Sequence, residues 1–368
     1  MGYINVIKTA IFVFPIVCIF LSLPFLVFHY RKYGSISFLR FLLIFSFFFY
    51  LLCAYFLVVL PLPSREAVVH YTRPYYNLKP FFVVPEIVMS GEFNVIDPDT
   101  YVFLFNQKYI EPLFNILMTI PFGIYLRYYF KCGFFKTLFL SFLLSLFFEL
   151  TQLTGLYYIY PRPYRLFDVN DLINNTSGGV IGFFVAPLFS VFLPSRDRID
   201  SKDYVRGKFV SVGRLGVSVF IDYFLIIVVS LVLFNFIRFK YACFLYLFLN
   251  FFSFVLVPYF SSGYSFGKWI LRFRNVGSDI SGFISFFRYF IRWFFVHIVI
   301  LNGWFVLLVI NNRFFDISIY IWIIYGIILF LFVILCFNSM VISNDFFVDR
   351  LLGISCESFI GLDDIDEV

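Results

Sequence analysis

The sequence predicts an all-α, polytopic membrane protein, and its composition, its long apolar blocks and the distribution of its basic residues all indicate this class. Hydrophobic residues make up 62% of the 368 residues, charged residues make up only 14%, and the mean hydropathy is +0.92. Soluble domains carry roughly 25% charged residues. A soluble fold of this length has no interior large enough for so much apolar surface, so soluble classes are excluded.

The apolar residues lie in nine long blocks. A bilayer core about 30 Å thick is crossed by roughly 20 apolar residues in a helix. Because lipid offers the backbone no hydrogen-bond partners, each block is expected to be a helix. About nine transmembrane helices are therefore predicted near residues 7–29, 39–60, 111–128, 134–157, 171–193, 212–237, 241–260, 293–312 and 316–338.

The basic residues predict the orientation of these helices. Alternate connections and the C-terminal segment hold 18 of the 28 Lys and Arg residues, and the opposite side holds 10. Cytoplasmic loops carry the excess of Lys and Arg. The sequence thus predicts a cell-membrane protein with its N-terminus outside and its C-terminus in the cytoplasm. The net charge of +6 reflects this topology, and we expect no nucleic-acid partner.

A charged stretch at 194–211 divides the chain into two membrane modules. We expect one module at 1–193, which includes an external segment at 61–110. A second module at 212–356 and an acidic tail at 357–368 follow. The external segment is rich in Tyr and Pro, which suits an interfacial loop with short strands or turns. A ligand-binding cap is the alternative.

Polar residues at membrane depth are costly and so mark candidate sites. One group lies at the predicted outer ends of the helices at 134–157 and 171–193: Glu149, Gln152, Arg165, Asp168, Asp171 and Asn175. Asp171 is the expected N-cap of its helix. Gly178 and Gly182 form a small-x-x-x-small pair, for which the helix at 134–157 is the expected partner. The group is either a hairpin lock, in which Arg165 pairs the carboxylates, or a ligand or catalytic site.

These residues, with Thr176 and the upstream stretch from Asn115 through Pro121 to Gly123, resemble the signature of the VanZ-like family over about 40–195. The turn between Gln152 and Arg165 carries the insertion YYIYPRPY, which departs from that pattern. The resemblance implies a bacterial cell-envelope protein that contributes to resistance against glycopeptides of the teicoplanin type. It supplies no mechanism.

The second module has its own polar residues, Arg214, Asp222 and Asp349, which resemble the RDD family over about 210–356. Arg214 and Asp222 are eight residues apart, so they lie near one helix face. We expect Asp222 to form a salt bridge with Arg214 or with an arginine of the loop at 261–292. A cation-carrier role for Asp222 is the alternative. The basic, aromatic loop at 261–292 is expected to contact anionic lipids.

Three functions therefore stay open. The chain is a glycopeptide-resistance protein of the cell envelope, a cation or small-solute transporter using Asp222, or an intramembrane enzyme on a lipid-linked substrate. Its expected partners are membrane lipids and a glycopeptide or lipid-linked cell-wall precursor. No histidine or cysteine pair has metal-ligand spacing, and no nucleophile lies beside a base. We expect no metal and no cofactor, and enzymatic activity is disfavoured.

Overall fold

The computed structural model describes residues 3–80, 107–234, 242–277, 282–304, 307, 311, 319–343 and 347–360. Several parts of the sequence predictions lie outside these residues: 81–106 of the external segment, 278–281 of the basic loop, 361–368 of the acidic tail, and the ends or parts of the predicted spans 212–237, 241–260, 293–312 and 316–338.

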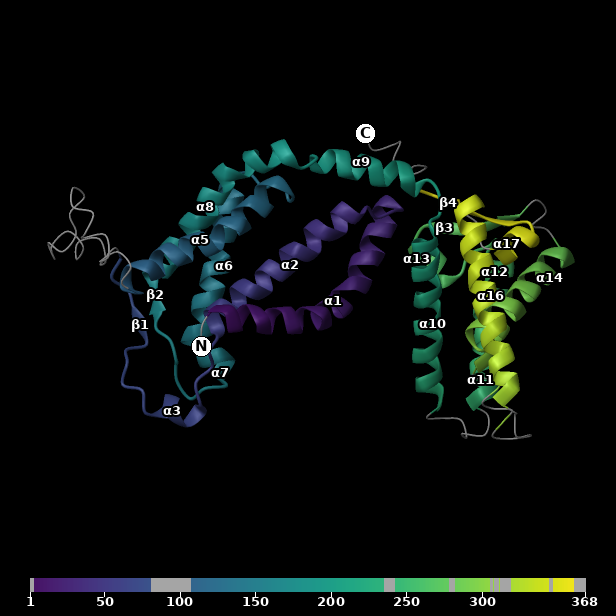
Figure 1. The fold of residues 1–368 in the computed structure, drawn as a ribbon, viewed down its shortest axis with the longest axis horizontal. Helices are drawn as coiled ribbons and strands as arrows, with labels where there is room; N and C mark the ends of the chain where they lie inside the picture. Colours follow the sequence, from purple (N-terminus) through teal and green to yellow (C-terminus); the bar gives the residue numbers. More distant parts are fainter. Residues whose placement is uncertain are drawn as a thin grey trace. The chain divides into compact units, whose positions relative to one another are not determined.

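The described residues form an all-α, polytopic membrane protein, as predicted (Figure 1). Six helical segments of the described chain are long and apolar enough to cross a membrane. They are α1 (Tyr3–Tyr33), α2 (Phe38–Val59), α6 (Phe134–Leu153), α8 (Val169–Phe192), α10 (Val212–Phe234) and the continuous pair α14 (Phe283–Arg292) and η4 (Trp293–Leu301).

The three remaining predicted spans also coincide with helices. Residues 111–128 lie in α5 (Gln107–Tyr128), which contains Pro112 and Pro121. Residues 241–260 form α11 (Ala242–Phe251), η3 (Phe252–Leu256) and α12 (Val257–Phe260). Residues 316–338 overlap α16 (Ile319–Ser343). The apolar part of each of the last two segments is shorter than that of the six long spans.

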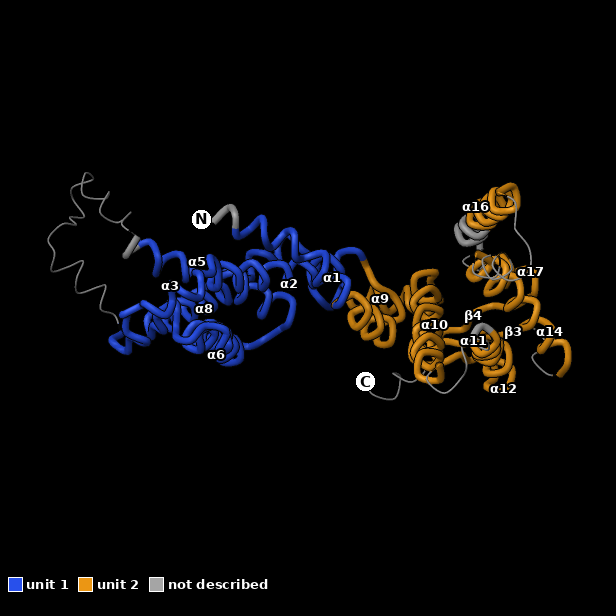
Figure 2. Tube along the Cα trace, turned by 90° about the horizontal axis from the view of Figure 1, so that it is seen from below, with its two compact units in different colours: residues 1–20, 38–199 blue, residues 21–37, 200–368 orange. Residues whose placement is uncertain are grey.

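The chain divides into two compact units, which Figure 2 shows in different colours. Unit 1 holds residues 1–20 and 38–199, and unit 2 holds 21–37 and 200–368. The boundary after residue 199 falls inside the charged stretch 194–211, most of which forms α9 (Arg196–Gly207). Residues 21–37 group with the second unit, a division that the linear order of the helices does not suggest.

In unit 1, α8 packs against both α5 and α6. A Cβ on Gly178 or Gly182 would overlap the carbonyl oxygen of Ile116 or Ile120 in α5. Gly179 is equally close to the Ser141 side chain of α6. The prediction that Gly178 and Gly182 face the helix at 134–157 is therefore wrong, because α8 lies between two neighbours and these glycines are on its α5 side. Their close-packing role is as expected.

Short elements cover the end of unit 1 that holds the predicted polar group. They are α3 (Arg65–Val69), β1 (Tyr76–Asn77), α7 (Gly155–Tyr158) and β2 (Phe167–Asp168). The two strands pair in parallel, with Tyr76 opposite Phe167. The hydroxyl groups of Tyr160 and Tyr164 donate to the carbonyl oxygens of Pro63 and Val59. The described part of the external segment thus folds as short turns and a strand.

Unit 2 contains a small antiparallel sheet that the sequence analysis did not predict. Strand β3 (Phe273–Gly277) pairs with β4 (Ile354–Ser358). The short helices α13 (Phe266–Ile270) and α17 (Phe347–Leu351) precede the two strands. Leu271 and Phe273, at the start of this sheet, are fully buried in a cluster with Tyr30 of α1 and Leu215 of α10, so the sheet packs against the membrane helices of unit 2.

Helix α14 is amphipathic, and its apolar face points away from the protein, as expected for a helix that contacts lipid. Phe283, Ile284 and Phe287 are exposed, whereas Ser285 and Tyr289 are buried. An apolar face turned outward suits hydrocarbon, since lipid tails are as apolar as the side chains themselves.

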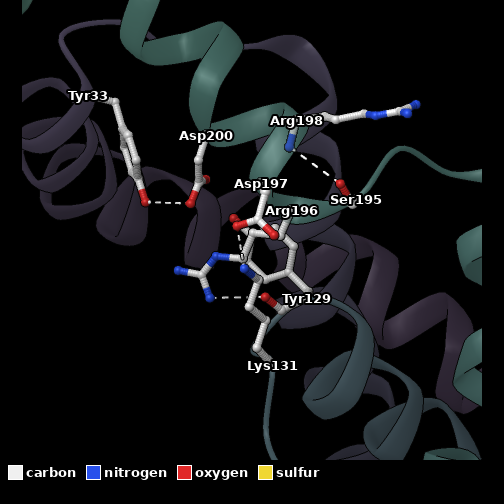
Figure 3. A network of polar contacts seen from close by, with 8 residues as sticks. All are labelled: Tyr33, Tyr129, Lys131, Ser195, Arg196, Asp197, Arg198 and Asp200. Atoms are coloured by element: carbon white, nitrogen blue, oxygen red, sulfur yellow. Dashed lines mark hydrogen bonds and ion pairs between the residues drawn. The ribbon is translucent and has the colours of Figure 1, made fainter. Parts of the chain in front are cut away.

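The first half of helix α9 makes several polar contacts (Figure 3). Within unit 1, Lys131 forms an ion pair with Asp197, and the Arg196 guanidinium donates to the Tyr129 carbonyl oxygen at 3.0 Å. Within unit 2, the Tyr33 hydroxyl donates to Asp200 at 3.2 Å. The charged linker is therefore an ordered helix.

Candidate functional site

The outer polar group is built on one face of α6. Ser141, Ser145, Glu149 and Gln152 are all buried on this helix, at spacings of four, four and three residues. These spacings place side chains on one helix face. Glu149 and Gln152 therefore share a face, as the sequence predicts, and the polar stripe extends two turns further toward the start of α6.

Glu149 is joined to the beginning of α8. Its carboxylate accepts a hydrogen bond from the backbone N–H of Asp168 at 2.8 Å. Asp168 has extended backbone angles (φ −126°, ψ 123°), and its own carboxylate accepts from the N–H of Asn170 at 2.8 Å. Asp168 is thus the N-cap of α8. The expectation that Asp171 is the cap is wrong, because the helix begins two residues before Asp171.

Asp171 and Asn175 continue the group down α8. The Asn115 side-chain amide of α5 donates to the Asp171 carboxylate at 2.7 Å. The Asn175 amide donates to the Ser145 hydroxyl at 3.1 Å. The Oδ1 atom of Asn175 is buried and has no hydrogen-bond partner in the part of the chain that the structure describes. The three helices α5, α6 and α8 therefore meet at one polar cluster.

Arg165 does not form the predicted lock. Its guanidinium donates to the Leu60 carbonyl oxygen at 2.9 Å. Gln152 donates to the Val58 carbonyl oxygen at 3.3 Å. Both acceptors lie at the end of α2, whose last carbonyl groups have no partner within the helix. A cation such as Arg165 is favoured at a helix C-terminus. The interpretation that Arg165 pairs with the carboxylates is therefore wrong.

We call Glu149, Asp168, Asp171 and Asn175 the outer cluster, after the side of the membrane on which the sequence predicts them, and this cluster is rich in hydrogen-bond acceptors. Within the described residues, none of its three carboxylates forms an ion pair. The described residues also contain no group of His, Cys, Asp and Glu arranged to hold a metal ion. Such a cluster can accept hydrogen bonds from amines or hydroxyl groups.

In unit 2, Arg214 and Asp222 share the buried face of α10 but do not touch. The Arg214 guanidinium donates to the carbonyl oxygens of Gly207, Leu271 and Arg272, and to the Ser358 hydroxyl at 2.8 Å. The predicted salt bridge between Arg214 and Asp222 is wrong. Eight residues separate the two side chains by about 12 Å along the helix. Arg214 instead binds the last residue of α9, the two residues before β3 and the last residue of β4.

Asp222 is held by neutral donors. The Ser265 hydroxyl and the Gly267 N–H donate to its two oxygens at 2.6 and 2.7 Å. Asp349 pairs with Arg292 through two hydrogen bonds of 2.5 and 3.1 Å, and both side chains are almost completely buried. The residues of the RDD resemblance thus lie in three separate contacts of unit 2.

Lys268 is a buried cation beside these contacts. Its amine donates to the Asn275 side-chain oxygen at 2.6 Å. Burial and, to a smaller extent, the Arg292 guanidinium lower the pKa of Lys268 to about 8, against the opposing effects of Cys356, Asp349 and Asp222. Lys268 therefore keeps its proton less firmly than an exposed lysine does.

A second buried hydrogen-bond network in unit 2 includes Tyr223, the residue after Asp222 in the sequence. The Tyr223 hydroxyl bonds His297 Nδ1 at 3.1 Å and accepts from the Asn302 amide at 2.9 Å. The His297 ring stacks on Phe254 at 3.7 Å. His297, which is isolated in the sequence, thus has a polar partner on another helix.

Sequence reasoning missed several members of these groups. The missed residues are Asn77, Ser141, Ser145, Ser265 and Lys268. The sequence could have indicated the two serines of α6, because they precede Glu149 at intervals of four residues and so lie on the same helix face. Asn77 had none, because its amide reaches Asp168, at 3.1 Å, only through the pairing of β1 and β2.

Comparison with known protein families supports the VanZ-like resemblance of unit 1. The VanZ/LLP1 family model matches residues 47–190, which include the whole outer cluster and lie within the predicted stretch 40–195. No curated protein and no solved structure matches the chain. The RDD resemblance rests on Arg214, Asp222 and Asp349 alone. Residues 47–190 of this polytopic membrane protein form a VanZ-like domain.

Proposed function

We propose that the chain is a bacterial cell-envelope protein whose VanZ-like unit lowers sensitivity to teicoplanin-type glycopeptides through its outer cluster. One observation carries this proposal. Three carboxylates and a buried amide oxygen gather where α5, α6 and α8 meet, and none of the carboxylates has a described ion-pair partner. Glycopeptides present amine, amide and hydroxyl donors, which such acceptors bind.

The test separates a binding role of the cluster from a structural one. Glu149→Gln keeps the size of the side chain and an oxygen to accept from the Asp168 N–H, but it removes the charge. We expect this variant to reach normal membrane abundance while the host loses its reduced sensitivity to the glycopeptide. Glu111→Gln makes the same substitution at an exposed carboxylate of α5 outside the cluster and is the matched control.

Two results would contradict the proposal. One is a host whose glycopeptide sensitivity never responds to the wild-type chain. The other is a Glu149→Gln variant that protects the host as well as the wild type does at equal abundance.

The proposal also requires the cluster to face outward. The distribution of Lys and Arg predicts that residue 70 lies outside and residue 205 inside. Both are exposed. We expect a membrane-impermeant thiol reagent to label His70→Cys, but not Val205→Cys, in intact cells. Labelling of position 205 would invert the topology and place the cluster on the cytoplasmic side.

A second candidate function belongs to unit 2. The RDD resemblance and the buried carboxylate of Asp222, which is held by a hydroxyl and an N–H, favour a cation-carrier role. The test is cation flux into proteoliposomes that contain the full chain. Asp222→Asn should abolish the flux, and wild-type protein without flux would remove this candidate.

A further inference from the structure

The buried face of α6 carries a row of polar side chains along most of the helix. Thr137, Ser141, Ser145 and Glu149 follow one another at intervals of four residues, and each is 0–2% exposed. Twelve residues at 1.5 Å per residue span about 18 Å, more than half of a bilayer core of about 30 Å. Because α6 is long and apolar enough to cross a membrane, three hydroxyl groups lead from the Glu149 carboxylate through much of its depth.

Helix α8 faces this row with residues that are polar or have no side chain. The Asn175 amide donates to Ser145 Oγ at 3.1 Å, and Ser145 Oγ donates to the Asp171 carbonyl oxygen at 3.2 Å. One turn further along both helices, Gly179 lies against Ser141, because a Cβ on this glycine would be 2.0 Å from the serine hydroxyl oxygen. The row therefore lies in the interface between α6 and α8.

Two buried polar atoms of this interface have no hydrogen-bond partner in the part of the chain that the structure describes. They are Ser141 Oγ and Asn175 Oδ1, on residues that are at most 3% exposed. Buried polar groups are nearly always hydrogen-bonded, either to protein atoms or to an ordered water molecule. Since the two atoms lie on neighbouring turns of facing helices, they indicate water within the interface.

The spacing of the row suits alternating hydroxyl groups and water molecules. Side chains four residues apart on a helix are separated by about 6 Å, which is too far for a direct hydrogen bond between two hydroxyl groups. Two O–H···O hydrogen bonds of about 2.8 Å each span nearly this distance through one water molecule. Hydroxyl groups and water both donate and accept, so each can take up one proton while it releases another.

Carboxylates lie at one end of the row. The charges that act on Glu149 include those of Asp171 and Asp168 of α8 and that of Arg165. Asp171 is partly exposed, so its carboxylate can exchange protons with water. Acidic side chains within membrane spans are typical of proton relays.

The other end of the row reaches the exposed start of α6. Thr137 lies in the first turn of this helix, and its hydroxyl group donates to the Gly133 carbonyl oxygen at 3.0 Å. Gly133 and the neighbouring Lys136 are exposed. The row thus connects proton-accepting carboxylates near one end of α6 with the surface at its other end.

We propose that unit 1 conducts protons along the buried face of α6, from Glu149 and Asp171 past Ser145 and Ser141 to Thr137, with water between successive hydroxyl groups. Each hydroxyl oxygen takes a proton from the water before it and releases its own proton to the water after it. The proton moves down its electrochemical gradient, so no other reactant is needed. This inference goes beyond the proposed function, because it requires no ligand at the outer cluster other than protons and water.

The experiment measures proton uptake into liposomes that contain the full chain and an enclosed pH-sensitive dye. A potassium gradient with valinomycin sets the membrane potential. We expect wild-type uptake to exceed that of empty liposomes. Ser141→Ala removes the middle hydroxyl group but keeps the Cβ that packs against Gly179, so it should fold. Its uptake should fall about tenfold, the loss expected for one missing hydrogen-bond step.

Two further variants locate the path. Ser145→Ala removes the next hydroxyl group of the row and should reduce uptake to a similar extent. Thr176→Ala removes a hydroxyl group of α8 that donates to the Leu172 carbonyl oxygen of its own helix, and it should leave uptake unchanged. Thermal unfolding of each variant in detergent checks that its fold is retained.

Four results would overturn the inference. Wild-type uptake equal to that of empty liposomes would show that the chain conducts no protons. Normal uptake by Ser141→Ala would show that protons do not follow α6. Uptake that is lost in Asp222→Asn but kept in Ser141→Ala would assign the flux to unit 2. Potassium entry through the chain without valinomycin would show a hydrated cation pore. Proton uptake by a chain that leaves glycopeptide sensitivity unchanged would support the proton path and contradict only the proposed function.

Discussion

The two units hold their buried polar groups in different ways. In unit 2, Arg292 is paired with Asp349, Arg214 binds three carbonyl groups and a hydroxyl, and the Lys268 amine has an amide partner. In unit 1, the Arg165 guanidinium binds the carbonyl oxygen of Leu60 at the end of α2 and forms no ion pair with the carboxylates of the outer cluster within the described residues. The charged side chains of unit 2 have hydrogen-bond or ion-pair partners within the protein. The outer cluster of unit 1 has oxygen atoms that can accept further hydrogen bonds.

This difference suggests different roles for similar residues. Breaking a buried pair leaves an uncompensated charge, so the contacts of unit 2 are expected to act mainly on stability. Acceptors with spare capacity contribute less to folding and more to the binding of a donor. Four variants, taken from the largest expected effect to the smallest, examine this comparison.

Gly182→Leu should have the largest effect. A side chain at this position overlaps the backbone of α5 at Ile120, and two backbones cannot separate without opening the packing of α8. Membrane abundance should fall to a small fraction of wild type. Gly216→Leu in α10 is the control, because a Cβ there meets nothing within 4 Å. Similar abundance of the two variants would refute close packing at Gly182.

Arg292→Ala should come next. It leaves the Asp349 carboxylate buried without its partner, at a cost of about 3–5 kcal/mol. Thermal unfolding of the purified chain in detergent measures this loss. Replacing both residues by apolar ones of similar size, as in Arg292→Met with Asp349→Leu, should recover most of it. A double variant no more stable than Arg292→Ala would show that the pair is more than an ion pair.

The buried Lys268 should make the stability of unit 2 depend on pH, with an effect of intermediate size. Its pKa in the folded chain is about 8, below the ordinary value of 10.5. Between these two values the unfolded chain binds more protons, so the stability of unit 2 should rise with pH. It should be lower at pH 7.5 than at pH 9.5, and Lys268→Met should reduce this difference. An unchanged difference in the variant would assign the pH effect to other groups.

Glu149→Gln should have the smallest effect on stability. The amide still accepts from the Asp168 N–H, and a buried neutral amide is less costly than a buried carboxylate. We expect a melting temperature in detergent that equals or exceeds that of the wild type. A fall as large as that of Arg292→Ala would make the outer cluster a structural element like the contacts of unit 2.

The sequence by itself determined the class of this protein. Runs of about 20 apolar residues fold as helices in lipid whatever their neighbours are, and each predicted span overlaps a helix in the described part of the chain. The residue types of the outer cluster were also readable, because an ionisable side chain in an apolar block stands out. The VanZ-like stretch was recognisable from the spacing of Glu149, Asp168 and Asn175.

The tertiary structure alone decided which residues meet. Arg214 and Asp222 lie on one helix face, yet they bind different segments, because partners far away in the sequence surround each of them. Arg165 follows the carbonyl groups of α2, and Gly182 faces α5, since both depend on how several helices pack together. Local sequence fixes helices through their own hydrogen bonds, whereas side-chain partners depend on contacts between segments that no local pattern records.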